Sequence, residues 1–150
     1  MKINLIKSVK EDLLVIAKMY KTEMSKPPYN ENWTEKKAIE KMKFYSKFYD
    51  LFTIKVNDKE NNQIAGFICI NPKFMCPGDV AFGEEFVIKS EFQSKGIGTY
   101  VIKEIIKLYK KKGFKRLLGI ADTKGKAIKL YYKLGIKPSK KDVLIERRLK

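Results

Sequence analysis

The chain has 150 residues, 44% of them hydrophobic, which is enough for one hydrophobic core and too few for two ordinary domains. Lys and Arg number 33 and Asp and Glu 17, so the net charge is +16, and there is no histidine. The missing histidine excludes Ser-His-Asp and Cys-His triads, histidine-ligated zinc and a histidine general base. We therefore expect a single domain over residues 1–150 whose proton transfers use other side chains or water.

The positive charge has two interpretations, an anionic partner and a compositional bias toward lysine. Arg116, Arg147 and Arg148 are the only arginines in the sequence, whereas base readout and bidentate phosphate clamps favour arginine. A nucleic-acid partner is therefore the less favoured interpretation, and a non-catalytic basic module that binds nucleic acid stays open as an alternative. In either case the positive field would attract an anionic cofactor.

The cysteines and the apolar runs indicate the compartment. Cys69 and Cys76 provide neither a disulfide framework nor a four-ligand metal set, so we expect free thiols and no metal. The longest apolar run, Ile64–Ile70, is far too short to span a bilayer, and the first eight residues resemble neither a signal peptide nor an anchor. We expect a cytoplasmic protein without a membrane partner, and a homodimer stays open.

The first half of the chain predicts one strand, two helices and a hairpin, in that order. Lys2–Ile6 is expected to be a strand, and a capping box at Ser8–Glu11 opens a helix to about Tyr20. Thr34 or a neighbour caps a second helix, which follows a proline-containing loop and reaches about Phe48. The expected strands of the hairpin are Leu51–Val56 and Gln63–Ile70.

The second half predicts strands and helices in alternation. A strand over Val80–Ile88 leads to an amphipathic helix from Ile97 to about Lys112, where Gly113 supplies the left-handed stop. The remaining expected elements are a strand Arg116–Ala121, a helix Lys124–Leu134 and a last strand Val143–Leu149. This order predicts an α/β domain with a mixed sheet.

A glycine-containing loop, Gln93-Ser94-Lys95-Gly96-Ile97-Gly98-Thr99, joins the expected strand ending at Ile88 to the helix that follows. The first N–H groups of a helix lack acceptors within the helix, and the helix dipole is positive there, so anions bind at such ends. Glycines let a phosphate approach the backbone closely. Val101 stands where the dinucleotide fingerprint has its third glycine, and the P-loop motif is absent. By itself the loop predicts either an anion site or an ordinary helix entry.

Two further motifs accompany this loop in the order and spacing of a known family. They are Ile64-Ala65-Gly66-Phe67 upstream and Ala127-x-x-Leu130-Tyr131-x-x-x-Gly135 downstream. Together with Gln93-x-x-Gly96-x-Gly98, they resemble the motifs of the GNAT superfamily of acetyl-CoA-dependent N-acetyltransferases. The resemblance covers nearly the whole chain and is best over residues 63–136. Two positions depart from the pattern: Lys124 stands where the family often has Asn, and Ile136 where it usually has Phe.

The resemblance implies an acyl-CoA N-acyltransferase fold with six to seven strands and about four helices. It also implies that acetyl-CoA is the co-substrate, with its pyrophosphate on the N–H groups of the glycine-containing loop. Phe86, Val87 and Ile88 would pair with the pantetheine arm, and a backbone N–H there would polarise the thioester carbonyl. The residues implied at the second cofactor helix are Lys124, Ala127 and Tyr131.

Acetyl transfer to an amine needs a base for the amine and an acid for the departing thiolate. Glu84 and Glu85 are the candidate bases, and strand alternation predicts that they point to opposite faces. Glu85 is favoured because the family often has Glu three residues before the last apolar position of this strand. Tyr131 is the candidate acid, since a phenol with a pKa of about 10 is protonated at neutral pH, although its helical spacing also fits a structural core position. Direct attack in a ternary complex is favoured over an acetyl-cysteine at Cys76, because no basic partner for that thiol is identifiable.

The acceptor amine is expected to bind near the aromatic-rich segment that follows the first helix. Tyr29 and Trp33 in its loop, together with Glu85, are the candidate substrate-binding residues, whereas Phe44 and Phe48 fit core positions at helical spacing. The segment is similar to the acceptor segment of some aminoglycoside-acetyltransferase-like members, so a small acceptor such as an aminoglycoside or polyamine is favoured. A protein N-alpha or lysine acetyltransferase stays open.

Overall fold

The computed structural model describes residues 1–59 and 61–150. Its elements are β1 (Lys2–Lys7), α1 (Asp12–Met24), α2 (Glu35–Phe48), β2 (Asp50–Asp58), β3 (Asn61–Asn71), β4 (Val80–Ile88), the short helix η1 (Ser90–Phe92), α3 (Ile97–Lys111), β5 (Arg116–Gly119) and α4 (Ala127–Lys133). The strands form a mixed sheet in the order β1-β2-β3-β4-β5, in which β5 is parallel to β4 and the other neighbours are antiparallel.

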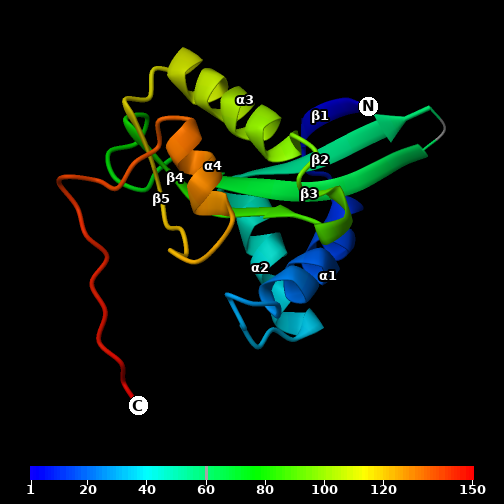
Figure 1. The fold of residues 1–150 in the computed structure, drawn as a ribbon, viewed down its shortest axis with the longest axis horizontal. Coiled ribbons are helices and arrows are strands. Elements are labelled where there is room, and N and C mark those ends of the chain that lie inside the picture. Colours follow the sequence, from blue (N-terminus) through cyan, green and yellow to red (C-terminus); the bar gives the residue numbers. More distant parts are fainter. Residues whose placement is uncertain (60) are drawn as a thin grey trace.

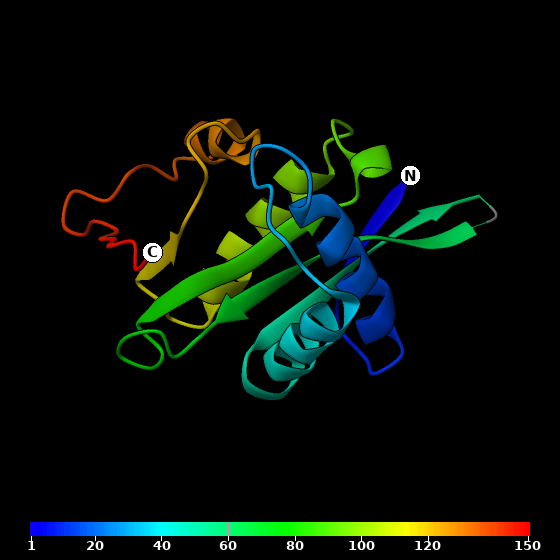
Figure 2. The same ribbon diagram turned by 90° about the horizontal axis from the view of Figure 1, so that it is seen from below.

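Helices cover both faces of this sheet, as Figure 1 and Figure 2 show: α1 and α2 lie on one face and α3 on the other. Alternate residues of β3 enter the two cores, because successive side chains of a strand point to opposite faces. Phe67 and Cys69 pack with α1 and α2, whereas Ile68 and Ile70 pack with α3. Side chains of α4 also pack on the α3 side of the sheet. The sheet is therefore buried between two apolar layers.

Most predicted elements are confirmed, and α2 shows why its start could be predicted. The Oγ1 of Thr34 accepts a hydrogen bond from the backbone N–H of Lys37 at 3.1 Å, which satisfies a donor of the first turn. The capping box before α1 is wrong, because the Oγ of Ser8 bonds instead to the Oγ1 of Thr53 at 2.6 Å. The N–H of Val9 is bonded to the carboxylate of Asp12 at 3.1 Å.

The predicted core positions Phe44 and Phe48 are also wrong, since both side chains are exposed. Helix α2 buries a narrow stripe made of Ala38, Met42 and Tyr45. The two phenylalanines lie outside this stripe and pack on each other, with ring centroids 5.0 Å apart. Apolar spacing alone could not tell which of two adjacent stripes faces the sheet.

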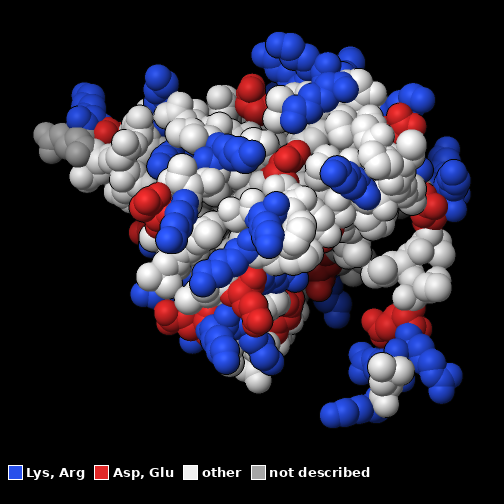
Figure 3. Space-filling view, turned by 180° about the vertical axis from the view of Figure 1, so that it is seen from behind, with Lys and Arg blue, Asp and Glu red and all other residues white. Residues whose placement is uncertain are grey.

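The predicted last strand, Val143–Leu149, is wrong: these residues form neither a strand nor a helix. A strand exists only where a neighbour accepts its hydrogen bonds, and within the described residues β5 is paired with β4 alone. The chain before this segment is attached to the sheet through the Arg116 guanidinium, which donates to the Asp142 carboxylate at 2.8 Å. Beyond that contact the tail stands clear of the body (Figure 3). The described sheet consequently has five strands instead of the six to seven expected.

The surface charge, the length of the helices and the possible metal ligands concern the predictions about nucleic acid, membrane and metal. On the face shown in Figure 3, basic side chains are scattered and interleaved with acidic ones, without a continuous basic stripe over the residues described there. Among residues 1–59 and 61–150, no helix is long and apolar enough to cross a membrane. The same residues contain no group of three or more His, Cys, Asp or Glu side chains that could hold a metal ion.

Candidate functional site

A groove of about 790 Å³, hereafter the β4 groove, opens along the carboxyl-terminal half of β4. Phe86, Val87 and Ile88 line it together with the first turn of α3 and one side of α4. Its other wall comes from the loop after α1, where Pro27, Pro28 and Tyr29 lie. This volume lies in the range of ligand pockets, which is about 300–1,000 Å³.

The glycine loop, residues 93–99, forms the end of the groove where α3 begins. Gly96 is the N-cap of α3 with φ +83°, a left-handed conformation that L side chains rarely adopt. A Cβ on Gly98 would lie 2.9 Å from the Cδ2 of Leu130 in α4, so glycine here permits close packing of α3 and α4. The left-handed backbone thus favours glycine at Gly96, and the packing of α3 on α4 favours it at Gly98. The first N–H groups of α3 have no acceptors within the helix and remain available to a ligand.

The start of the glycine loop is held by a hydrogen-bond network around Glu23, which is 7% exposed. The Glu23 carboxylate accepts hydrogen bonds from the Oγ of Ser90 at 2.5 Å and the Nζ of Lys26 at 2.7 Å. Gln93 donates from Nε2 to the carbonyl oxygen of Ile88 at 2.7 Å and to Glu23 at 3.5 Å. The last turn of α1 therefore fixes where the loop leaves β4.

The β4 groove is electropositive. Among the described residues that line it, the charged side chains are one glutamate and five lysines: Glu23, Lys26, Lys124, Lys126, Lys129 and Lys133. Lysines from three separate segments converge here, from the loop after α1, the turn before α4 and α4 itself. Such a field concentrates anions in the groove. The loop residue Lys95, by contrast, is exposed and extends over the Phe92 ring at 5.9 Å.

Helix α4 contributes Ala127 and Leu130 to the groove, whereas Tyr131 turns toward the core on the α3 side of the sheet. Burial raises the pKa of Tyr131 to about 12, with a smaller contribution from nearby Tyr29. The phenol is consequently protonated at neutral pH, the state required of a proton donor. Of the two roles that the sequence left open, the structure gives Tyr131 the core position, and a role as proton donor stays a prediction.

Glu85 lies on β4 directly before the groove residues and points toward α1 and α2. Its Oε1 accepts hydrogen bonds from the hydroxyl groups of Tyr20 at 2.8 Å and Tyr45 at 3.2 Å. The Nζ of Lys41 lies 3.6 Å from the same oxygen. Burial raises the pKa of Glu85 above the usual range of a glutamate, and the two phenols and the ammonium oppose that shift without cancelling it. A carboxylate with a raised pKa is a stronger base than an ordinary glutamate.

Glu84 is on the same side of the sheet as Glu85, contrary to the prediction from strand alternation. The register of β3 and β4 shifts here: Cys69 is opposite Glu85 and Ile70 is opposite Gly83, so Glu84 is an extra residue in a β-bulge. Glu84 accepts a hydrogen bond from the Nδ2 of Asn71 at 3.3 Å. The bulge thus brings two carboxylates to the face covered by α2.

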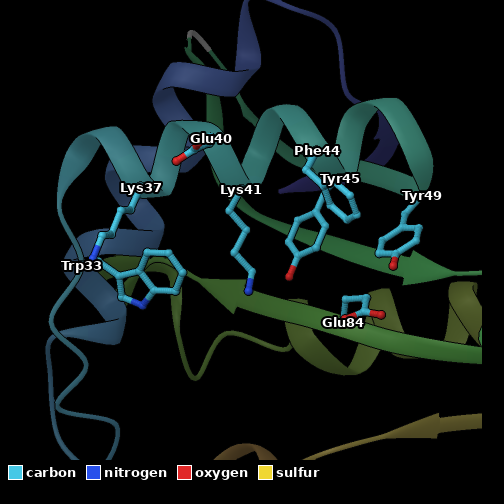
Figure 4. Close-up of a pocket in the computed structure, with 8 residues that line it drawn as sticks. All are labelled: Trp33, Lys37, Glu40, Lys41, Phe44, Tyr45, Tyr49 and Glu84. Carbon is cyan, nitrogen blue, oxygen red and sulfur yellow. The ribbon is translucent and has the colours of Figure 1, made fainter.

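A second hollow, the α2 pocket, lies between α2 and β4 and has a volume of about 450 Å³ (Figure 4). Its lining residues are Trp33, Lys37, Glu40, Lys41, Phe44, Tyr45, Tyr49 and Glu84. Trp33 is fixed by its indole N–H, which donates to Glu31 at 2.8 Å, and by an edge contact with the ring of Tyr20. Trp33 and Tyr29, predicted together, are separated by the structure: Trp33 lines the α2 pocket and Tyr29 lines the β4 groove.

The comparisons with known proteins bear on this arrangement. A family model described as "Acetyltransferase (GNAT) family" matches residues 17–136. This span contains both hollows, the glycine loop and α4. The chain belongs to the GNAT acetyltransferase family. The resemblance seen in the three sequence motifs is therefore confirmed.

Solved structures agree with the GNAT fold. A possible acetyltransferase from Clostridium difficile 630 is 13% identical, with a TM-score of 0.79 over 100% of this chain and 99% of that chain. AAC(6')-Iy in complex with the bisubstrate analog CoA-S-monomethyl-acetylneamine is 13% identical, with a TM-score of 0.71 over 99% of both chains. A transcriptional regulator from Bacillus halodurans C-125 is 18% identical, with a TM-score of 0.72 over 97% of this chain and 100% of that chain. A sequence search of curated proteins finds no significant match.

The GNAT chain also contains site residues that sequence reasoning missed. Tyr20 and Tyr45, which bond to Glu85, are 65 and 40 positions away from it in the chain. Lys41 and Glu23 were likewise not predicted to take part in a site. The available signals were the place of Tyr20 on the apolar face of α1 and of Tyr45 in the aromatic-rich α2, and neither identifies their partner. Such contacts depend on how α1 and α2 pack over β4.

Proposed function

We propose that this GNAT protein transfers the acetyl group of acetyl-CoA to the primary amine of a small molecule, by direct attack in a ternary complex. The observation that carries the proposal is the position of Glu85, at the junction of the electropositive β4 groove and the aromatic α2 pocket. Its neighbours Phe86 to Ile88 line the groove, and the Tyr45 that bonds to it lines the pocket. A base at this junction serves an amine that arrives from one hollow and a thioester from the other.

The β4 groove suits coenzyme A by charge and by backbone. Its converging lysines would neutralise the phosphates, and the first N–H groups of α3 around Gly96 and Gly98 would bond to the pyrophosphate. The thioester would lie beside β4, where a backbone N–H polarises its carbonyl. Glu85 would accept the amine proton, and the Tyr131 hydroxyl would protonate the sulfur as the C–S bond breaks.

The state of the thiols supports direct transfer. Cys69 is buried, and its burial with the nearby Glu84 and Glu85 carboxylates raises the pKa of its thiol far above neutral pH. A thiol in that state is a poor nucleophile. Cys76 is exposed and lies in the loop between β3 and β4, and its Sγ is directed at the carbonyl oxygen of Pro77 at 4.0 Å. An acetyl-cysteine intermediate therefore has little support.

The acceptor class is proposed from the α2 pocket. Three aromatic rings on α2 and its flanking residues line the pocket together with Trp33, the carboxylates of Glu40 and Glu84, and two lysines. Aromatic faces and carboxylates attract a substrate ammonium, and a volume of about 450 Å³ suits a small amine. AAC(6')-Iy, which shares the fold, was solved with an analog that joins coenzyme A to an acetylneamine.

The test combines calorimetry with a turnover assay. We expect acetyl-CoA to bind the purified protein, and coenzyme A to be released when polyamines, aminoglycosides, amino acids or peptides are added. Release with peptides alone would favour a protein acetyltransferase. Absence of acetyl-CoA binding, together with DNA or RNA binding that falls steeply with salt, would replace the proposal by a nucleic-acid-binding module.

A further inference from the structure

Lys41 projects from the middle of α2 into the α2 pocket rather than into solvent (Figure 4). Its Nζ lies 5.3 Å from the ring centroid of Trp33 and 5.4 Å from that of Tyr45. The same atom lies 3.6 Å from the Oε1 of Glu85. The side chain is 34% exposed, so it remains reachable from the pocket.

These three contacts make a site for an ammonium group. Cations bind over the faces of Trp and Tyr within about 6 Å of the ring centroid, and a carboxylate supplies the opposite charge. Lysines at protein surfaces usually extend the ammonium into water. Lys41 instead places it beside two rings and against the Glu85 carboxylate, whose side chain is 17% exposed, which is the position a substrate amine would need.

The position of Glu85 connects this site to the β4 groove. The Nζ of Lys41 contacts Glu85 on the face covered by α2, and the next residue, Phe86, packs on the α3 side and lines the groove. The amine of Lys41 therefore faces the candidate base, one residue before the part of β4 beside which the thioester would lie.

We infer that Lys41 is itself acetylated on Nζ when acetyl-CoA is bound and the acceptor amine is absent. This inference rests on the proposed function. The Nζ ammonium gives one proton to the Glu85 carboxylate, and the neutral amine attacks the thioester carbonyl carbon. The N–C bond forms, the C–S bond breaks and the thiolate leaves as the thiol after taking the second amine proton. The products are acetyl-lysine, coenzyme A and one proton held by Glu85 or released to water.

Lys37 is the matched internal control for a chain rich in lysines. It lies one turn earlier on α2 and lines the same pocket, so it shares the surroundings of Lys41. In the described residues its ammonium has no ion pair with Glu85, and no aromatic ring lies beneath it. Acetylation that is merely chemical should treat both residues alike, whereas transfer assisted by Glu85 should select Lys41.

The experiment is incubation of the purified full chain with acetyl-CoA alone, followed by peptide mass spectrometry over time. We expect the rate of acetylation at Lys41 to exceed that at Lys37 at least tenfold, and Glu85→Gln to remove this excess without changing Lys37. In Lys41→Arg the selective modification should vanish, while the fold is checked by circular dichroism. Equal rates at Lys41 and Lys37, or no effect of Glu85→Gln, would overturn the inference.

The same protein samples separate this inference from the proposed function. Coenzyme A release with added amines but without selective Lys41 acetylation would overturn the inference and leave the acetyltransferase proposal intact. Absence of acetyl-CoA binding by calorimetry, with neither amine turnover nor Lys41 acetylation, would overturn both.

Discussion

The β4 groove and the α2 pocket share strand β4 but are built in different ways. One side of the groove is made by a contiguous run, β4, the glycine loop and α3, with α4 packed against it and the loop after α1 as the other wall, and its polar contacts to a ligand would come largely from backbone N–H groups and lysines. The pocket is made by side chains that meet between α2 and β4, and its charged lining consists of two lysines and two glutamates, with the buried Glu85 carboxylate beside Tyr45 and Lys41. A site of the first kind is specified locally, whereas a site of the second kind depends on packing.

This difference also separates two chemical tasks. Backbone amides at a helix N-terminus bind an anion whatever side chains surround them. Proton transfer instead requires one carboxyl group with an altered pKa, which needs burial and specific neighbours. Cofactor binding should therefore tolerate substitutions outside the glycines, whereas proton transfer should be sensitive to a change in the single carboxyl group.

The largest effect is expected from Glu85→Gln. We expect kcat for amine acetylation to fall by a factor of about 10² or more while acetyl-CoA affinity is unchanged. Tm at neutral pH should not fall, because the pKa of Glu85 is raised by folding and the ionised form is therefore the less stable one in the folded protein. Tyr20 and Tyr45 can still donate to the amide oxygen. Glu35→Gln, at an exposed position of α2 outside the pocket lining, is the control and should retain activity.

The pH profile tests the same residue independently. Since the base must be ionised, kcat/KM should rise with pH through the pKa of Glu85, which burial sets above the ordinary glutamate range. The stability contributed by the neutral carboxyl is present at low pH and is lost as the pH rises through the same pKa. If the Glu85→Gln variant keeps the same rise of kcat/KM with pH, another group is responsible for the rise, and Glu84 in the bulge is the next candidate.

A smaller effect is expected from Gly98→Val, which alters the groove alone. The first added carbon would lie 2.9 Å from the Leu130 Cδ2 and 3.4 Å from the Ile88 Cδ1, so the side chain of Leu130, which lines the groove, must move and change the shape of the groove. We expect the Kd for acetyl-CoA to rise about tenfold, or about 1.4 kcal/mol, as measured by calorimetry. Gly113→Ala at the far end of α3, where φ is +89°, is the control. It should lower Tm and leave the Kd unchanged, and equal Kd values for both variants would contradict the packing role of Gly98.

Tyr131→Phe should lower kcat less than Glu85→Gln does. The departing group is a thiolate of modest basicity, with a pKa of about 8.5, so water can supply part of the protonation and the expected loss is about tenfold. Affinity for acetyl-CoA should be unchanged, because phenylalanine keeps the ring that packs against the core on the α3 side. The exposed neighbour Tyr132 provides the matched control in Tyr132→Phe. A fall in Tm without any change in kcat would make Tyr131 purely structural.

The smallest effect is expected from single lysines of the groove. Lys126→Gln removes one of several exposed charges, each worth about 0.2–1 kcal/mol, so the Kd for acetyl-CoA should rise about two- to threefold at low salt. The difference should disappear near 0.5 M salt, where a Debye length of about 4 Å screens exposed charges. Lys107→Gln, on the exposed side of α3, is the control with the same change in net charge. An equal rise of the Kd in both variants would show that the attraction of acetyl-CoA comes from the net charge of the whole surface and not from the lysines of the groove.

The comparison of groove and pocket also explains what the sequence could predict. Gly96 and Thr34 act on their own backbone or on residues three positions away, so their roles follow from local patterns. The bulge at Glu84 depends on the register between two strands, which no pattern within β4 encodes. The hydrogen-bond donors to Glu85 come from helices distant in the chain. The prediction of the last strand was wrong because strand propensity does not supply a neighbouring strand to pair with.

Helix α1 has one consequence for redesign of acceptor specificity. Three positions apart on one side of this helix, Tyr20 holds Glu85 and Glu23 holds the start of the glycine loop. An exchange of segments that includes α1 would therefore shift the base and the phosphate site at once. A graft boundary after Tyr29 keeps α1 and the groove wall, and Tyr45 of α2 must be retained because it also bonds to Glu85.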